Sequence, residues 1–418
     1  MRVLLIGSGG REHALALGLS VDPAVTHLVV APGNPGIAAL AETRPVAVTD
    51  PEAVAALAVD TAADLVVIGP EAPLVAGVAD AVRAKGIACF GPTAAAAELE
   101  GSKAFAKEIM AAAGVPTARS VTWTVDDDPA RLAEALDRFG PPYVVKNDGL
   151  AGGKGVVVTD DREEARRHAE SCGRVVIEEY LNGPEVSLFV VTDGKDAVPL
   201  MPAQDFKRIG DGDTGPNTGG MGAYTPLPWA PPGLVDQVMA SVVRPTLAEM
   251  ARRGRPFAGL LYVGLALTDA GTKVIEYNAR FGDPETEAVL ALLESPLGGL
   301  LAAAATDRLG EHPPLSWRSG AAVTVIVAAE GYPDQPRTGD VITGADRPGV
   351  LHAGTARDDN GNLVSAGGRV LACTGVGPDL AGARYAAYRL VNGVELAGAQ
   401  HRTDIAQAAV QGDIQVRR

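Results

Sequence analysis

Cysteine is scarce in this chain, and the few cysteines present lie far apart. Cys89, Cys172 and Cys373 are the three cysteines among 418 residues, and they form neither a CxxC pair nor a zinc-ligand spacing. Widely spaced cysteines of odd number are typical of a reducing compartment. We therefore expect a cytoplasmic protein.

Basic residues and long apolar runs are also in short supply. The net charge is −15 and the isoelectric point is near 4.9, whereas nucleic-acid binding needs a broad basic face. The apolar runs around 259–267 and 321–329 are well short of the ~20 residues that span a bilayer. Val3–Ile6 is too short for a signal-peptide core. We expect neither a nucleic-acid partner nor a membrane role.

What the chain does have is enough apolar residues for a large core: 47% of its 418 residues, a length that suits two to four domains. In the first hundred residues, short apolar runs alternate with alanine-rich segments of helical character, which predicts a parallel, doubly wound sheet. The predicted strands are Val3–Ile6, His27–Val30, Leu65–Ile68 and Ile87–Phe90, and the predicted helices are Arg11–Leu19, Pro51–Val59 and Leu74–Ala84.

The rest of the chain mixes α and β signals. Residues 101–115 predict one helix, with Ser102 as N-cap and Gly114 as its end. A small α+β unit follows at about 116–182, with strands Tyr143–Lys146, Gly155–Thr159 and Val175–Glu179. The last hundred residues predict an α+β lobe with strands Ala322–Ala329, Val350–Thr355 and Arg369–Gly375 and a helix Leu380–Asn392. We divide the chain into domains at 1–100, 101–320 and 321–418.

A glycine turn, Gly7-Ser8-Gly9-Gly10, lies between the first predicted strand and helix. Glu12 occupies the place where a dinucleotide fingerprint needs its third glycine, which argues against nicotinamide or flavin binding and so against a dehydrogenase. Such a turn can bind one phosphate through backbone N–H groups, but it can equally be a tight structural turn.

A second glycine-rich segment runs from Lys146 to Gly155 and has a lysine near each end. Backbone amides and a lysine suit ATP phosphates, although an ordinary hairpin loop remains an alternative. Lys146 ends an otherwise apolar strand and so needs a counter-charge. The strand 175–181 leads into a hinge whose backbone suits an adenine edge, with Glu185 suited to ribose hydroxyls; a solvated strand end is the alternative.

Two polar runs complete the candidate site: Gln204–Arg208 with Asp213–Gly222, and Glu276–Thr286. The first is too irregular for a helix or strand and predicts a functional loop. In the second, Glu276, Asn278 and Arg280 alternate onto one face of a strand. Carboxylate and amide oxygens suit Mg²⁺, and Arg280 could stabilise a transferring phosphoryl group. A surface ion pair and a simple helix start at Asp283-Pro284-Glu285 are the alternatives.

With these motifs in order, the chain resembles the ATP-grasp superfamily and, more closely, the phosphoribosylamine–glycine ligases. The segments that carry the resemblance are Gly7–His13, Ala31–Asn34, Gly69–Leu74, Gly101–Lys103, Asp148–Gly155, Asp213–Gly222, Glu276–Thr286 and Arg337–Asp340. The resemblance implies an ATP-grasp core with a mobile lid at about 116–182.

The resemblance also implies roles for individual residues. The expected metal ligands for Mg²⁺ or Mn²⁺ are Glu276 and Asn278, and the expected catalytic residues are Arg280, Asp213 and Lys207. The expected ATP-binding residues are Lys103, Lys146, Gly152, Gly153, Lys154, Gly155, Glu178, Glu179, Tyr180, Leu181 and Glu185. Gly9, Gly10, Glu12, Pro70 and Glu71 would hold 5-phosphoribosylamine, and Asp213 and Arg280 would contact substrate, with Asp213 helping to place glycine.

The implied reaction joins glycine to 5-phosphoribosylamine through glycyl phosphate, giving glycinamide ribonucleotide, ADP and phosphate in purine biosynthesis, in a monomer. A different carboxylate–amine ligase and a non-catalytic nucleotide-binding regulator are the alternatives. Three departures from relatives stand out. Phe206 replaces a common histidine, Gly152 follows Ala151 where a second alanine is frequent, and the segment from Glu164 to Arg174 is short.

Overall fold

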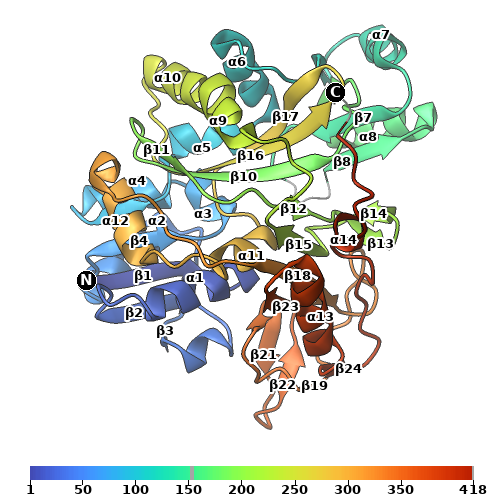
Figure 1. The fold of residues 1–418 in the computed structure, drawn as a ribbon. Helices are drawn as coiled ribbons and strands as arrows, with labels where there is room; N and C mark the ends of the chain where they lie inside the picture. Colours follow the sequence, from blue (N-terminus) through green and yellow to red (C-terminus); the bar gives the residue numbers. More distant parts are fainter. Residues whose placement is uncertain (151–154, 417–418) are drawn as a thin grey trace.

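The computed structural model of the chain describes residues 1–150 and 155–416. The N-terminal part forms an open, fully parallel sheet (Figure 1). The strand order is β3-β2-β1-β4-β5, with parallel pairing at every step. The strands are β1 (Arg2–Gly7), β2 (His27–Pro32), β3 (Glu42–Thr43), β4 (Leu65–Ile68) and β5 (Ala88–Phe90). The predicted doubly wound sheet is confirmed.

Alternate side chains of this sheet enter two separate cores, as strand geometry requires. Leu4 and Ile6 pack with α2 (Pro51–Asp60) and α4 (Val78–Ala84). Val3 and Leu5 pack on the other side with α1 (Gly10–Ser20) and α12 (Leu297–Ala305). Because both faces are covered, the strands are apolar throughout, which is why the sequence revealed them so clearly.

One predicted helix is in fact two. The segment predicted as a helix from Leu74 to Ala84 forms α3 (Glu71–Val75) and α4, interrupted at Gly77. Gly77 has φ = 87°, a left-handed conformation that breaks the helical path and that glycine adopts without strain. The segment predicted at 101–115 is α6 (Lys103–Ala113), which follows a separate helix, α5 (Ala94–Gly101). Ser102 caps α6 and Gly114 ends it, as predicted.

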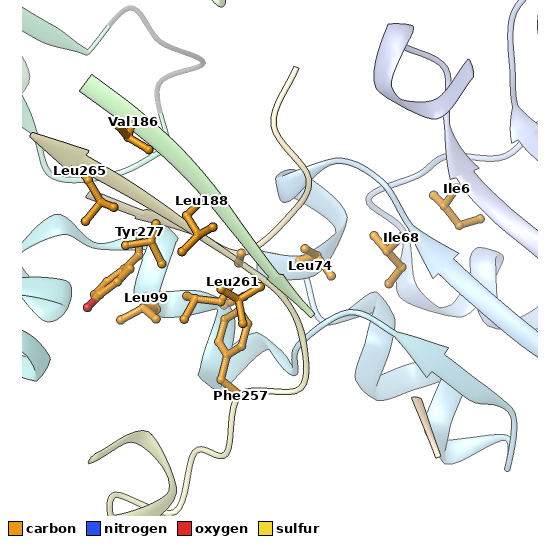
Figure 2. Packing of buried hydrophobic residues seen from close by; sticks show 14 of the residues in the cluster. Ile6, Ile68, Leu74, Leu99, Val186, Leu188, Phe257, Leu261, Leu265 and Tyr277 are labelled. Atoms are coloured by element: carbon orange, nitrogen blue, oxygen red, sulfur yellow. The ribbon is translucent and has the colours of Figure 1, made fainter. Parts of the chain in front are cut away.

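A second, antiparallel sheet lies beside the first. Its strand order is β11-β10-β16-β17, from Ala197–Pro199, Glu185–Thr192, Gly259–Thr268 and Gly271–Asn278. Figure 2 shows how the main core continues between the two sheets, from Ile6 and Ile68 through Leu74 to Leu261 and Leu188. The helices α9 (Leu234–Val238) and α10 (Arg244–Arg252), joined by a π-helical turn at Met239–Val243, cover this second sheet.

The unit at 120–178 is a small sheet with its own core, drawn in teal and green at the upper right of Figure 1. Its antiparallel order is β6-β9-β7-β8. The elements are β6 (Ser120–Thr124), α7 (Pro129–Phe139), β7 (Tyr143–Asn147), β8 (Val156–Thr159), α8 (Arg162–Cys172) and β9 (Arg174–Glu178). The predicted hairpin strands on either side of the glycine-rich loop are therefore confirmed.

A third large sheet has the order β12-β15-β18-β23-β20. Its strands are Gln204–Asp205, Gly222–Thr225, Ala321–Ala328, Arg369–Gly377 and Val350–His352, and α13 (Leu380–Val391) packs on it. The C-terminal lobe is thus α+β, as predicted, with two strands donated by the central segment. Shorter elements complete it: β19 (Ile342–Thr343), β21 (Thr355–Arg357), β22 (Leu363–Ser365), β24 (Glu395–Leu396) and α14 (Gln407–Gln411).

The polar run at 208–217 is more regular than we predicted. It forms an antiparallel hairpin of β13 (Arg208–Gly210) and β14 (Thr214–Asn217). Gly212 and Asp213 both have positive φ, 66° and 55°, which reverses the chain within three residues. The prediction of an irregular loop was wrong because main-chain pairing does not need apolar side chains. None of the helices in the described ranges has both the length and the apolar character needed to cross a bilayer.

Candidate active site

A cavity of about 690 Å³ is lined by the second sheet, the small sheet, strands β12 and β23 of the third sheet, and residues of α1, α3, α5 and α6. Most predicted site residues line it: Lys103, Lys146, Gly155, Glu178, Glu179, Tyr180, Leu181, Glu185, Lys207, Asp213, Glu71, Glu276, Asn278 and Arg280. Gly9, Gly10, Glu12 and Pro70 are not among the described residues that line it. Gly152, Gly153 and Lys154 lie outside the described residues.

Two lysines share one buried carboxylate at the inner end of the small sheet. Glu178, 3% exposed, ion-pairs with Lys146 and, at 2.6 Å, with Lys107 Nζ. Lys146 Nζ also donates to the Ile275 carbonyl at 3.1 Å. Glu178 is therefore the counter-charge that Lys146 was expected to need, and a solvated strand end is wrong for this residue. Because the Glu178 carboxylate is already paired with two lysines, we expect the backbone groups at this position, and not the side chain, to pair with an adenine.

The N-terminus of α6 holds the start of the glycine-rich hairpin. Ser102 Oγ donates to Asp148 Oδ1 at 3.1 Å, and the Ala104 N–H donates to the same oxygen at 3.1 Å. Lys103 Nζ donates to the Gly149 carbonyl at 3.0 Å, and burial lowers the pKa of Lys103. The arrangement places an ammonium group directly under the loop that we expect to close over phosphates.

Glu276 is a carboxylate surrounded by cations. Burial alone would raise its pKa, but Lys207, Lys146, Lys103 and Arg280 together lower it, so Glu276 stays charged. Within the described residues, neither a hydrogen bond nor an ion pair joins the side chain of Glu276 or Asn278 to a neighbour, and both face the cavity.

An unengaged, charged carboxylate beside an amide oxygen fits Mg²⁺ or Mn²⁺, which usually keeps waters and substrate phosphates as its other ligands. No group of three or more His, Cys, Asp or Glu side chains in residues 1–150 and 155–416 could enclose a metal ion by itself. A metal at Glu276 and Asn278 would therefore depend on the nucleotide for further ligands.

Arg280 lies just beyond the strand on which we expected it. β17 ends at Asn278, so Arg280 occupies the following bend, yet it still lines the cavity. Its Nε donates to Glu71 Oε2 at 3.1 Å and lies 3.5 Å from Glu100 Oε1. Burial would lower the pKa of Arg280, but the carboxylates of Glu100 and Glu71 raise it further above its ordinary value. The guanidinium is thus a fixed cation between the N-terminal part and the central sheet.

Lys207, Glu185 and Asp205 are a second set of titratable groups that line the cavity. Lys207 Nζ lies 2.6 Å from Glu185 Oε2. Although burial acts in the other direction, Glu185, Asp205 and Glu276 raise the pKa of Lys207 well above its ordinary value. Burial and the carboxylates of Glu285, Glu185 and Glu276 raise the pKa of Asp205 to about 8. Glu185 is engaged with Lys207, so a ribose hydroxyl would have to share that carboxylate.

The glycine turn at the start of α1 encloses the side chain of Glu12. Glu12 is 2% exposed, and its carboxylate accepts from the Gly9 N–H at 2.6 Å and from Arg11 Nε at 2.5 Å. A Cβ on Gly69 would lie 2.1 Å from Glu12 Oε1. Glu12 therefore shapes the wall behind Arg11, which itself lines the cavity. The Gly9 N–H is thus occupied by Glu12, and a role of this turn in substrate binding stays a prediction.

Asp213 lies at the tip of the β13–β14 hairpin. Its side chain is 69% exposed, it lines the cavity, and its Oδ1 is 2.7 Å from Nη1 of Arg402. Asp213 and Lys207 are thus close in the sequence, but Asp213 forms an ion pair with Arg402 and Lys207 forms one with Glu185.

Several residues of the site escaped prediction. Lys107 lies four residues after Lys103 on α6, so the helical spacing could have predicted that both lysines face the site. Arg11 directly follows the glycine turn, but we assigned no role to it. Arg369, which comes from β23, donates to the carbonyls of Gly219 at 2.5 Å and Asp283 at 2.7 Å. It ties both polar runs to the C-terminal lobe. Nothing local in the sequence marks such a contact, because its partners are 86 to 150 residues away.

The chain can now be compared with known proteins. Three family descriptions match in order: "Phosphoribosylglycinamide synthetase, N domain" at residues 1–100, the ATP-grasp (A) domain of the same enzyme at 101–286, and its C domain at 322–408. The phosphoribosylamine–glycine ligase of Mycobacterium leprae is 60% identical over 425 aligned positions, covering 100% of both chains.

Solved structures agree. A phosphoribosylamine–glycine ligase from Thermotoga maritima matches with a TM-score of 0.84 and 36% identity, covering 97% of this chain and 100% of that one. The biotin carboxylase domain of Hydrogenobacter thermophilus 2-oxoglutarate carboxylase, solved with MgADP, matches with a TM-score of 0.73, covering 96% and 91%; at 17% identity it shows a shared fold. By its domains, its full-length similarity and its structure, the chain belongs to the phosphoribosylamine–glycine ligase family of ATP-grasp enzymes.

Proposed function

We propose that this enzyme joins glycine to 5-phosphoribosylamine at the expense of ATP, giving glycinamide ribonucleotide, ADP and phosphate. One observation carries the proposal in the structure. Within residues 1–150 and 155–416, the side chains of Glu276 and Asn278 make neither a hydrogen bond nor an ion pair, and they face a cavity that the cations Lys103, Lys146, Lys207 and Arg280 also line. This combination suits a nucleoside triphosphate with its metal, together with a small carboxylic acid.

ATP would lie with its phosphates toward Lys103, Lys146 and the glycine-rich segment that ends at Gly155. Gly152, Gly153 and Lys154 remain predictions for that loop. The backbone of residues 178–181 would pair with adenine, since the Glu178 and Glu179 carboxylates are engaged with lysine and arginine neighbours. Tyr180 and Leu181 line the same stretch of the cavity, and Glu185 would accept from ribose hydroxyls while it contacts Lys207.

Glu276 and Asn278 would hold Mg²⁺ or Mn²⁺. When bound, the metal supplies positive charge to the phosphate oxygens of ATP. The lowered pKa of Glu276 supports this role, because a ligand carboxylate must be deprotonated at neutral pH.

The first step forms a bond between a glycine carboxylate oxygen and the γ-phosphorus, and the bond to the ADP oxygen breaks. Arg280 and Lys207 would stabilise the negative charge on the phosphoryl group and the attacking carboxylate. The amine of phosphoribosylamine then attacks the glycyl carbonyl carbon, phosphate leaves, and the amine loses a proton. The protein supplies orientation and excludes water from the acyl phosphate, which needs no covalent nucleophile.

Phosphoribosylamine would lie toward the N-terminal sheet. Glu71 faces the cavity, and burial is outweighed by Arg280 and Arg11, which lower the pKa of Glu71 so that it can accept from hydroxyl or amine groups. Gly9, Gly10, Glu12 and Pro70 would act from behind this wall, by shaping it. Asp213, on the hairpin, would help to place glycine.

The same proposal places a monomer in the cytoplasm, with domain boundaries near residues 100 and 320. The small sheet at about 116–182 would act as the lid over ATP.

The test is ADP release from ATP and Mg²⁺, with and without glycine and freshly made phosphoribosylamine. We expect release that requires both substrates and that falls at least about 100-fold in Arg280→Ala. Arg252→Ala serves as the matched control and should retain activity, because Arg252 is exposed on α10 and is not among the described residues that line the cavity. Stimulation by a different acid would indicate another ligase, and ATP binding without turnover would indicate a regulator; either result would overturn the proposal.

A further inference from the structure

Three consecutive residues near the C-terminus bind three consecutive residues of the β13–β14 turn. The Thr403 N–H donates to Asp211 Oδ1 at 2.8 Å, and the Thr403 hydroxyl donates to the other oxygen of that carboxylate. The Gly212 N–H donates to Asp404 Oδ2 at 2.8 Å. Arg402 Nη1 donates to Asp213 Oδ1 at 2.7 Å. The turn is thus attached residue by residue to the segment 402–404, which lies about 190 positions away.

Arg402 is the centre of this attachment. It is 1% exposed, and its Nε and Nη2 bind both oxygens of Asp404 at 2.7 and 2.6 Å. Nη1 serves Asp213 and the Arg208 carbonyl at once. The guanidinium carbon lies 4.8 Å from the centre of the Phe206 ring. A planar group with five donors can make all these contacts, whereas a lysine ammonium cannot.

The anchored hairpin is part of the cavity wall. Arg208, Asp213 and Asn217 all line the cavity. On its far side, Asn217 Nδ2 donates to the Val156 carbonyl of β8 at 3.3 Å, which connects the hairpin to the small sheet. In Figure 1, β13 and β14 lie beside α14, between the C-terminal lobe and that sheet. The position of this wall is therefore set from the C-terminal segment.

We propose that Arg402 is a positioning residue that holds the β13–β14 hairpin, and with it Asp213, in the geometry that binds glycine. The inference rests on the proposed function, because it assigns the glycine end of that reaction to the hairpin. Arg402 acts through Asp213 and the hairpin backbone and does not itself line the cavity in the described residues.

The experiment compares Arg402→Lys with Arg384→Lys. Arg384 is a matched control: it donates to the Thr403 and Ile405 carbonyls and lies over the Tyr388 ring, so it contacts the backbone of the same C-terminal segment. Within the described residues, neither a hydrogen bond nor an ion pair joins Arg384 to the β13–β14 hairpin.

For Arg402→Lys we expect the KM for glycine to rise about tenfold or more while the KM for ATP stays within about threefold, because misplacement by ~1 Å is enough to impair positioning. Arg384→Lys should leave both KM values near wild type. A merely structural defect would reduce the active fraction, and so kcat, without separating the two KM values. Hydrogen exchange of the peptide 206–221 should also accelerate in Arg402→Lys and remain slow in Arg384→Lys.

Unchanged glycine KM with slow exchange at 206–221 would overturn the inference, and so would equal effects of the two variants. Arg402→Met, which removes the charge, should strengthen both effects; if it fails to fold, Arg402→Lys still decides. If the wild-type enzyme shows no glycine-dependent ADP release, the proposed function fails on its own. The exchange measurement would then still show whether Arg402 holds the hairpin.

Discussion

Replacing Glu178 by glutamine should weaken the junction between the small sheet and the rest of the site. Glu178 is 3% exposed and pairs with both Lys146 and Lys107. Removing one member of a buried ionic group costs about 3–5 kcal/mol, because it leaves uncompensated charge. Glutamine keeps the shape and one acceptor oxygen, so we expect a loss of about 3 kcal/mol, roughly 100-fold in an opening constant.

Nucleotide should reverse part of this loss. If the phosphates of ATP take over as the partners of Lys146, the variant should regain more protection on adding MgATP than the wild type does. The assay is hydrogen exchange of the peptides that cover β7 and β9, with and without MgATP. Glu163→Gln is the control, since this exposed carboxylate lies on α8 of the same unit and pairs with Arg166 at the surface, where an ion pair contributes little.

The reasoning fails if Glu178→Gln exchanges within about twofold of wild type, since a buried pair should matter by far more than that. It also fails if MgATP leaves the difference unchanged, which would mean that Lys146 does not transfer from Glu178 to phosphate. A similar acceleration in Glu163→Gln would show a general loosening of the sheet.

Three further predictions concern pH and metal. Partial burial would raise the pKa of Glu179, but hydrogen bonds from Arg119 and Lys273 lower it from 4.5 to about 2. The contribution of Glu179 to folding stability is therefore complete above pH 4.5 and is lost as the pH falls toward 2. Urea midpoints of Glu179→Gln and wild type should therefore differ at pH 7 and converge as pH falls through that window; a constant difference would contradict this. Burial and His352 lower the pKa of His13 from 6.5 to about 4, so stability should fall as pH drops through that range, and less so in His13→Gln. Chemical denaturation of both proteins at pH 7 and pH 5 measures how much stability each loses; an equal loss in wild type and His13→Gln would refute the prediction. Glu276→Gln should raise the Mg²⁺ concentration for half-maximal ADP release by about tenfold or more, and excess EDTA should abolish release in the wild type; an unchanged Mg²⁺ titration would exclude Glu276 as a ligand.

Local signals predicted the fold well wherever the controlling interaction is local. The strands of the first sheet are apolar because both faces are covered. Ser102 marks the start of α6 through its side chain, which accepts from the Phe105 N–H, and Gly114 marks the end through its left-handed backbone. The break at Gly77 was missed, because a single glycine within an apolar periodic segment is compatible with either a continuous or a broken helix.

The sequence indicated which candidate site residues lie together where those residues are close in the chain. Glu276 and Asn278 lie two positions apart on one strand and do face one cavity. The partner of Lys146 could be predicted only as a carboxylate of unknown position, because the pairing of β7 with β9 decides which residue reaches it. Arg402 was beyond prediction, since its contact with Asp213 depends on how the C-terminal segment crosses the central hairpin.

The charges of the cavity explain why these distant contacts matter. Three of its cations are already paired inside the protein: Lys146 with Glu178, Lys207 with Glu185 and Arg280 with Glu71. An unpaired charge in such an enclosed place is costly, so these carboxylates offset that cost before nucleotide arrives. A triphosphate brings more negative charge than any one of them and can compete for the same cations. We infer that ATP binding exchanges internal partners for phosphate oxygens, and that the affinity for ATP reflects the difference between the two sets of contacts.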